Sequence, residues 1–214
     1  MKLQGLKANF LGDSITEGAG VPDRAFAYWN ILKRNYGLAE ARCYGISGTR
    51  IARQQQPTVD HPRFDLDFCS RVEEMDPDAD LIVVFGGTND FGHGDAPFGT
   101  MADRTPDSFY GACHVLMRSL IEKYPTSTIV IMTPLHRAVE TKEDGSKPDL
   151  CVYVRAIREV AEFYGLPVMD LYATSGINPQ IHKQETRYAP DGLHPNIAGA
   201  ERIAERLGNF LLAL

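Results

Sequence analysis

Short runs of apolar residues alternate along the chain with longer segments in which apolar positions recur every three or four residues. The clearest run is Leu81-Ile82-Val83-Val84-Phe85, which two glycines follow. A continuous apolar run of this length indicates a strand buried on both faces, as in a parallel sheet. The pattern predicts strands at residues 6–11, 42–46, 81–85, 128–132 and 167–171, and helices at residues 22–36, 106–124, 150–164 and 195–212.

Capping residues suggest where two of these helices begin and end. Thr105 followed by Pro106 is typical of an N-cap and a first helical position, and Asp149 is a second candidate N-cap. Gly165 suits the left-handed residue that often follows a helix. Strands and helices alternate without a repeat or linker that would divide the chain. The sequence therefore predicts an α/β fold with a parallel sheet, in a single domain covering residues 1–214.

Four longer irregular stretches separate the predicted elements, at residues 49–68, 90–104, 134–148 and 172–193. Three of them directly follow predicted strands. In open α/β sheets, ligands bind outside the carboxyl ends of the strands. We therefore expect the functional site at the edge of the sheet where these loops lie.

Composition and charge exclude several classes of protein. The chain has 214 residues, 43% hydrophobic and 23% charged, so it can bury a core without disulfides or metal. Its formal net charge of −6 argues against a nucleic-acid partner. No apolar stretch reaches the roughly 20 residues that span a bilayer, and no secretory signal is recognisable. Four scattered cysteines without a CxxC pair argue against a zinc site and suit a reducing compartment. We therefore expect a cytoplasmic protein without stable membrane insertion.

Two short motifs contain residues that could form a catalytic serine site. Ser14 follows the first predicted strand in Gly12-Asp13-Ser14, where a tight turn can hold its hydroxyl at the strand end. A nucleophilic serine needs a nearby base that is itself oriented by an acceptor. Asp191 and His194 are three residues apart around a glycine, just before the last helix, so the carboxylate can reach one imidazole nitrogen. Each motif alone also fits an ordinary loop serine or a helix-capping pair.

Two further strand ends offer hydrogen-bond donors for an oxyanion. Asn89 follows the strand at 81–85 and can direct its side-chain amide into the predicted site, although Asn is also a common turn residue. Gly48 follows the strand at 42–46 and can bring its backbone N–H close to a substrate. Gly45 is an alternative backbone donor. We favour Gly48 because it lies at the start of the loop, whereas Gly45 lies within the predicted strand.

Taken together, these motifs resemble those of the SGNH (GDSL-type) hydrolase superfamily. The first block corresponds to Gly12-Asp13-Ser14, with Ile15 where many members have leucine, and the second-block glycine corresponds to Gly48. The third block, GxND, is Gly87-Thr88-Asn89-Asp90, and the last block, DxxH, is Asp191-Gly192-Leu193-His194. The resemblance spans nearly the whole chain. It implies a flavodoxin-like three-layer α/β/α sandwich with a five-stranded parallel sheet.

The resemblance also implies an activity, which is carboxylic ester hydrolysis without a metal or cofactor. Ser14 would be the nucleophile, His194 the general base, and Asp191 the group that orients His194. The backbone N–H groups of Ser14 and Gly48 and the side chain of Asn89 would form the oxyanion hole. The absence of a G-x-S-x-G elbow, and the order of the three catalytic residues, argue against the α/β-hydrolase fold.

The expected substrate is a small acyl ester. The family resemblance favours short acyl groups, such as acetyl groups on carbohydrate. His93, Arg187 and Tyr188 are candidate substrate contacts because they lie close to the last two blocks. A lysophospholipase or thioesterase with the same catalytic residues is an alternative. A catalytically silent ligand-binding module and a flavin-binding protein are alternatives of other classes. The sequence leaves open the acyl chain length, the alcohol, the pathway and the oligomeric state.

Overall fold

Five parallel strands form one sheet in the computed structural model, which describes residues 1–214. The strand order is β2-β1-β3-β4-β5, the order of flavodoxin-like folds. The predicted number of strands and their parallel direction are confirmed. The strands are β1 (Lys7–Gly12), β2 (Glu40–Gly45), β3 (Leu81–Phe85), β4 (Thr128–Met132) and β5 (Val168–Met169).

The central strands bury both of their faces, as the continuous apolar runs predicted. Along β3, Ile82 and Val84 pack into one hydrophobic cluster, whereas Leu81, Val83 and Phe85 pack into a second cluster on the other side. This alternation follows from the opposite directions of successive side chains in a strand. The two clusters contain 26 and 24 buried residues. The sheet is therefore the middle layer between two cores of similar size.

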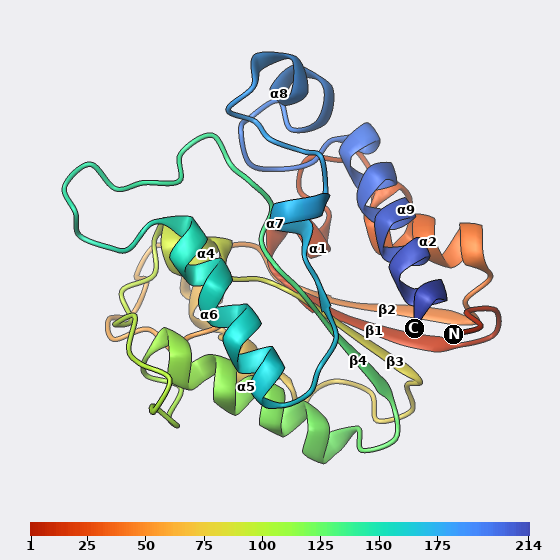
Figure 1. Cartoon of the computed structure of the whole chain (residues 1–214), viewed down its shortest axis with the longest axis horizontal. Coiled ribbons are helices and arrows are strands. Elements are labelled where there is room, and N and C mark those ends of the chain that lie inside the picture. Colours follow the sequence, from red (N-terminus) through yellow and green to blue (C-terminus); the bar gives the residue numbers. More distant parts are fainter.

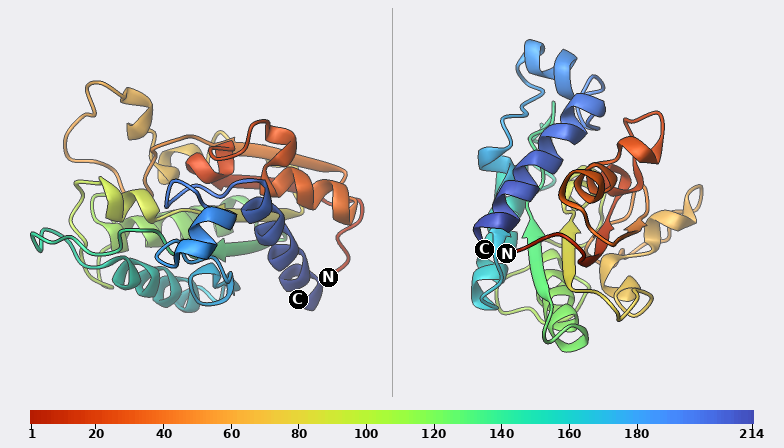
Figure 2. Two further views of the ribbon diagram at one scale, coloured as in Figure 1. Left: turned by 90° about the horizontal axis from the view of Figure 1, so that it is seen from above. Right: turned by 90° about the vertical axis from the view of Figure 1, so that its right-hand side faces the viewer.

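Helices cover both faces of the sheet and complete a three-layer α/β/α sandwich (Figures 1 and 2). On one face, α2 (Tyr28–Tyr36) packs beside α9 (Ile197–Ala213), and on the other α5 (Phe109–Lys123) packs beside α6 (Leu150–Phe163). The two chain ends lie close together: the amino group of Met1 donates to the carbonyl of Leu211 at 3.0 Å. No helix in this fold has both the length and the apolar composition that crossing a bilayer requires.

The predicted start of the α5 helix is wrong. The helix begins at Phe109, and Ser108 is its N-cap, with its hydroxyl accepting from the backbone N–H of Gly111 at 3.2 Å. The N–H groups of Phe109 and Tyr110 donate to the carbonyls of Pro97 and Phe98. The preceding loop therefore supplies the acceptors that the first turn lacks, and the Thr-Pro pair lies outside the helix.

The predicted helix at 22–36 is divided in two, into η1 (Arg24–Phe26) and α2. Six short helices of one or two turns were not predicted, because they are too short to show a hydrophobic period. Local caps hold some of them, as where the Asp67 carboxylate accepts from the N–H of Ser70 at 2.9 Å. The short helices are α1 (Ser14–Glu17), η2 (Pro62–Asp65), α3 (Phe68–Arg71), α4 (Thr88–Gly92), α7 (Leu171–Thr174) and α8 (His182–Tyr188).

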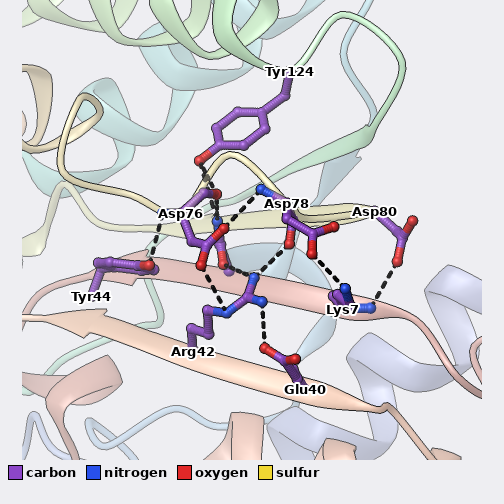
Figure 3. Close-up of polar contacts among 9 residues, drawn as sticks. Lys7, Glu40, Arg42, Tyr44, Asp76, Asp78, Asp80 and Tyr124 are labelled. Atoms are coloured by element: carbon purple, nitrogen blue, oxygen red, sulfur yellow. Dashed lines mark hydrogen bonds and ion pairs between the residues drawn. The ribbon is translucent and has the colours of Figure 1, made fainter.

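A polar network joins β1 and β2 to the segment before β3, at the amino ends of these strands (Figure 3). The Arg42 guanidinium donates to the carbonyl of Asp78 at 2.6 Å, lies 3.6 Å from the Asp76 carboxylate and forms an ion pair with Glu40. Lys7 forms an ion pair with Asp78. Because parallel strands place their amino ends at one edge, this network lies opposite the edge expected to hold the functional site.

We expect Arg42→Gln to lower the free energy of unfolding by about 1–2 kcal/mol, because several hydrogen bonds to a charged group are lost near the surface. Chemical denaturation measures this change. Arg34→Gln, which removes an exposed arginine from α2, is the control and should have a much smaller effect. Ester hydrolysis should be unchanged in both variants, and a large loss of activity in Arg42→Gln alone would contradict this separation of the two edges.

Candidate active site

The register of the parallel strands places their carboxyl ends in one row. Gly12 at the end of β1 is paired with Gly45 at the end of β2 and with Phe85 at the end of β3, which is in turn paired with Met132 at the end of β4. The loops that follow these strands therefore open at the same edge of the sheet.

Ser14 is the first residue of α1, two residues after Gly12 at the end of β1. Asp13 is the N-cap of this single turn, and its buried carboxylate accepts from the N–H of Ile15 at 3.0 Å. This bond braces the turn that carries Ser14. Ser14 is only 6% exposed, so the turn holds its hydroxyl in one place within the cleft.

His194 lies directly over Ser14, in the loop that leads into α9. Its Nε2 atom is 3.0 Å from the Ser14 hydroxyl, and its Nδ1 atom is 2.6 Å from the Asp191 carboxylate. The other Asp191 oxygen accepts from the backbone N–H groups of Leu193 and His194, at 2.9 and 2.7 Å. Partial burial raises the pKa of Asp191, but these hydrogen bonds outweigh it and hold that pKa below its usual range. The ionised carboxylate therefore fixes the proton on Nδ1 and leaves Nε2 as an acceptor facing Ser14.

The GxND block binds the loop after β2 to α4. The Asn89 amide donates to the carbonyl of Thr49 at 3.0 Å, and the Asp90 carboxylate accepts from the N–H groups of Ile51 and Ala52 at 3.0 and 2.9 Å. Only one amide hydrogen of Asn89 is used in this way. The block therefore both fixes the neighbouring loop and leaves a side-chain donor available at the cleft.

Gly48 lies on the cleft, whereas Gly45 is the last residue of β2. Gly48 has φ = +76° and lines the same cleft as Ser14 and Asn89, and its N–H has no acceptor within the chain. A Cβ at Gly48 would come within 2.2 Å of the Phe64 ring. The N–H of Gly45 faces the Cys43 sulfur at 3.4 Å. This arrangement favours Gly48 over Gly45 as the oxyanion donor.

A single cleft of about 340 Å³ contains the serine and histidine together with both further oxyanion candidates. It is lined by Ser14, Ala19, Ser47, Gly48, Phe64, Asn89, Gly92, His93, Arg137, Leu193 and His194. Ala19, Phe64 and Leu193 are the only apolar side chains among them, although apolar atoms form most of the exposed lining surface.

The three predicted substrate contacts lie in two different places. His93 lines the cleft, and its Nδ1 atom is 2.9 Å from Arg50, which must be the donor. Partial burial, followed by the charge of Arg50, lowers the pKa of His93 to about 4, so its ring is neutral with the proton on Nε2. Arg187 and Tyr188 are not among the lining residues, and the Tyr188 hydroxyl contacts Arg202 at 2.6 Å. Their role as substrate contacts stays a prediction.

Sequence reasoning missed three arginines that shape the site. Arg71 is buried and donates to the carbonyls of Gly12 and Tyr44, which joins the ends of β1 and β2. Arg50 forms an ion pair with Asp65 at 2.8 Å while it holds His93, and Arg137 lines the cleft from the loop after β4. For Arg71, the only signal in the sequence is a phenylalanine, Phe68, three residues earlier, and in the structure Arg71 lies over its ring. The positions of Arg50 and Arg137 depend on the paths of loops.

Comparison with known proteins identifies the family of the chain. The family model of the GDSL-like lipase/acylhydrolase family matches residues 10–202. The chain belongs to this family and is a carboxylic ester hydrolase, as the resemblance implied. No curated protein sequence matches the chain.

Several solved structures share the fold. A protein from Lactobacillus plantarum is 31% identical, with a TM-score of 0.85 and 98% of each chain covered. A possible lipase from Chitinophaga pinensis is 21% identical, with a TM-score of 0.70, over 97% of this chain and 98% of that one. An acetyl xylan esterase is also 21% identical, with a TM-score of 0.65, over 95% and 98% of the two chains. Because the last two structures are only 21% identical to this chain, their similarity establishes a shared fold and nothing further.

The buried Asp90 carboxyl should make the unfolding free energy depend on pH. Burial raises the pKa of Asp90 to about 6 from 3.8. The folded state therefore binds more protons than the unfolded state between these values, and stability falls as the pH rises from about 4 to about 6. Between pH 4 and pH 6, we expect wild type to lose about 3 kcal/mol of unfolding free energy relative to Asp90→Asn, which lacks this carboxyl.

Denaturant titrations of both proteins at several pH values measure this difference. The pKa of Asp13 is also raised to about 6 by burial, but Asp13 is present in both proteins, so most of its contribution cancels. A difference that does not vary with pH, or that varies in the opposite direction, would contradict the burial of an Asp90 carboxyl with this pKa.

Proposed function

We propose that this chain is a serine esterase that hydrolyses short acyl esters, including acetyl esters of carbohydrates, through Ser14, His194 and Asp191. The observation that carries the proposal is the continuous chain of hydrogen bonds from Ser14 to His194 and on to Asp191, at 3.0 and 2.6 Å, in a cleft with two further oxyanion donors. This is the arrangement by which a serine hydroxyl is activated in unrelated folds.

In the acylation step, the Ser14 Oγ atom attacks the ester carbonyl carbon while His194 Nε2 takes the hydroxyl proton. Asp191 keeps the imidazolium oriented and stabilises its charge. When the tetrahedral intermediate collapses, the bond to the alcohol oxygen breaks and His194 gives its proton to the leaving alcohol. Ser14 then carries the acyl group as an ester.

In the deacylation step, a water molecule replaces the serine as nucleophile and His194 again takes the proton. Attack on the acyl carbon gives a second tetrahedral intermediate. Its collapse breaks the bond to Ser14 Oγ and releases the carboxylic acid, while His194 gives its proton to Oγ and restores the hydroxyl. In both steps, negative charge develops on the carbonyl oxygen. The backbone N–H groups of Ser14 and Gly48 and the side-chain amide of Asn89 are the proposed donors to this oxygen. Such fixed donors stabilise the transition state because they need no reorganisation.

The size of the cleft supports a short acyl group. A volume of about 340 Å³ suits an acetyl group and a small alcohol better than a long hydrocarbon chain. An acetyl xylan esterase has the same fold, so the fold is compatible with acetyl ester substrates. A lysophospholipase or long-chain thioesterase would need a more extended apolar pocket.

We expect Ser14→Ala to abolish hydrolysis of p-nitrophenyl acetate, because the nucleophile is removed while the fold is retained. The assay is a series of p-nitrophenyl esters from acetate to palmitate with wild type and variant, and kcat/KM should fall as the acyl chain lengthens. Ser47→Ala, which removes a different hydroxyl at the cleft, is the matched control and should keep activity. Equal activity in wild type and Ser14→Ala would refute the serine mechanism.

We expect Asn89→Ala to lower kcat by roughly 10²–10³-fold, which is the effect of losing one oxyanion donor. The variant also loses the bond to Thr49, so circular dichroism and a thermal unfolding curve must establish that it is folded at the assay temperature. A reduction of less than about threefold in a folded variant would exclude Asn89 as an oxyanion donor of this strength.

A further inference from the structure

The Arg137 guanidinium lies in the cleft without an acidic partner. It lines the same cavity as Ser14 and His194, and Nη1 donates to the carbonyl and the hydroxyl of Thr88, at 3.1 and 3.3 Å. No carboxylate oxygen lies within 4.0 Å of it. The nearest acid along the chain, Glu140, accepts instead from His136, Tyr172 and the backbone N–H of Arg137. Arg137 therefore forms no ion pair, and only the more distant charges of Glu140 and Asp13 act on it favourably.

The surroundings hold this guanidinium in place. Its central carbon lies 5.4 Å from the centre of the Phe91 ring, over the ring face. A Cβ at Gly92 would come within 2.9 Å of Nη1, so the glycine provides the space that the guanidinium occupies. Partial burial lowers the pKa of Arg137. The group is thus fixed by contacts on two sides and partly removed from water, where an opposite charge interacts more strongly than at an open surface.

Two neighbouring lysines add positive charge beside Arg137. Lys142 donates to the carbonyl of Gly92 at 2.9 Å, and Lys147 donates to the carbonyl of Asp90 at 3.2 Å. Neither lysine forms an ion pair. The neutral His93 ring, whose Nδ1 atom accepts from Arg50, leaves an Nε2–H donor on the same cleft. Four cationic groups, Arg50, Arg137, Lys142 and Lys147, therefore act on His93, although the whole chain has a net charge of −6.

We propose that Arg137 is a specificity-determining residue that binds a carboxylate carried by the ester substrate. The inference rests on the proposed esterase function and narrows its substrate class to esters with a negatively charged group near the reacting carbonyl. A guanidinium suits this role because its planar donors match the two oxygens of a carboxylate. The carboxylate can belong to the acyl part or to the alcohol part, and the experiment distinguishes these two sources.

The test compares anionic esters with neutral esters of nearly the same shape. Mono-p-nitrophenyl adipate carries a carboxylate on the acyl side, and methyl p-nitrophenyl adipate is its neutral counterpart. 3-Acetoxybenzoate carries a carboxylate on the alcohol side, and methyl 3-acetoxybenzoate is its neutral counterpart. The measured quantity is the ratio of kcat/KM for the anionic ester to that for its methyl ester, after subtraction of spontaneous hydrolysis. In wild type, we expect a ratio above one for one of the two pairs, and a fall in that ratio as ionic strength rises.

Arg137→Gln should lower this ratio by at least about tenfold, because it keeps most of the side chain and removes the charge. Gly92→Ala keeps the charge but displaces the guanidinium, so it should lower the ratio in the same direction. Arg118→Gln is the matched control, since it removes an equal charge from an exposed position on α5, where Arg118 pairs with Glu122 at 2.7 Å. Its ratio should equal that of wild type.

The outcomes separate this inference from the proposed function. If hydrolysis depends on Ser14 but the ratio is the same in wild type and Arg137→Gln for both pairs, the role of Arg137 is refuted and the esterase proposal remains. If Ser14→Ala hydrolyses the neutral esters as well as wild type does, the proposed function itself fails. An effect confined to the adipate pair assigns the carboxylate to the acyl side, and one confined to the benzoate pair assigns it to the alcohol side.

Discussion

The register of the parallel strands is the constraint on which the site depends. Gly12, Gly45, Phe85 and Met132 end their strands in one hydrogen-bonded row. The register is strongly specified because both faces of the central strands are buried, and a shift by one residue would exchange the two faces. Consequently, loops that are far apart in sequence leave the sheet at the same edge. Ser14, Gly48 and Asn89 come together for this reason.

The register alone brings these loops close, and buried polar contacts then fix their positions. Arg71 connects the strand ends through Gly12 and Tyr44, and Asp90 accepts from Ile51 and Ala52. A buried polar group is costly when it has no partner, so each of these contacts penalises movement of the loop that it holds. The result is a set of donors and a nucleophile arranged before substrate binds, which is what electrostatic stabilisation of a transition state requires.

The charges at the two edges of the sheet are arranged differently. At the amino edge, Lys7 and Arg42 are surrounded by carboxylates, and their charges are largely compensated (Figure 3). At the carboxyl edge, Asp191 is paired with His194, whereas Arg137 has no acidic partner. An overall negative net charge therefore coexists with an arginine that lines the cleft without an ion pair, and the net charge alone says little about the substrate.

The sequence by itself determined the central strands, the α/β class and the motif residues, because each depends on neighbours within a few positions. The apolar runs of β3 and β4 and the short spacing of Asp191 and His194 are of this kind. The tertiary structure decided where α5 begins, because the acceptors for Phe109 and Tyr110 come from a separate loop. It also decided that Arg137 and Phe64 line the same cleft as Ser14, while Arg187 and Tyr188 lie outside the cleft lining. These positions depend on the paths of long loops, which are set by contacts between distant segments and leave no periodic pattern in the chain.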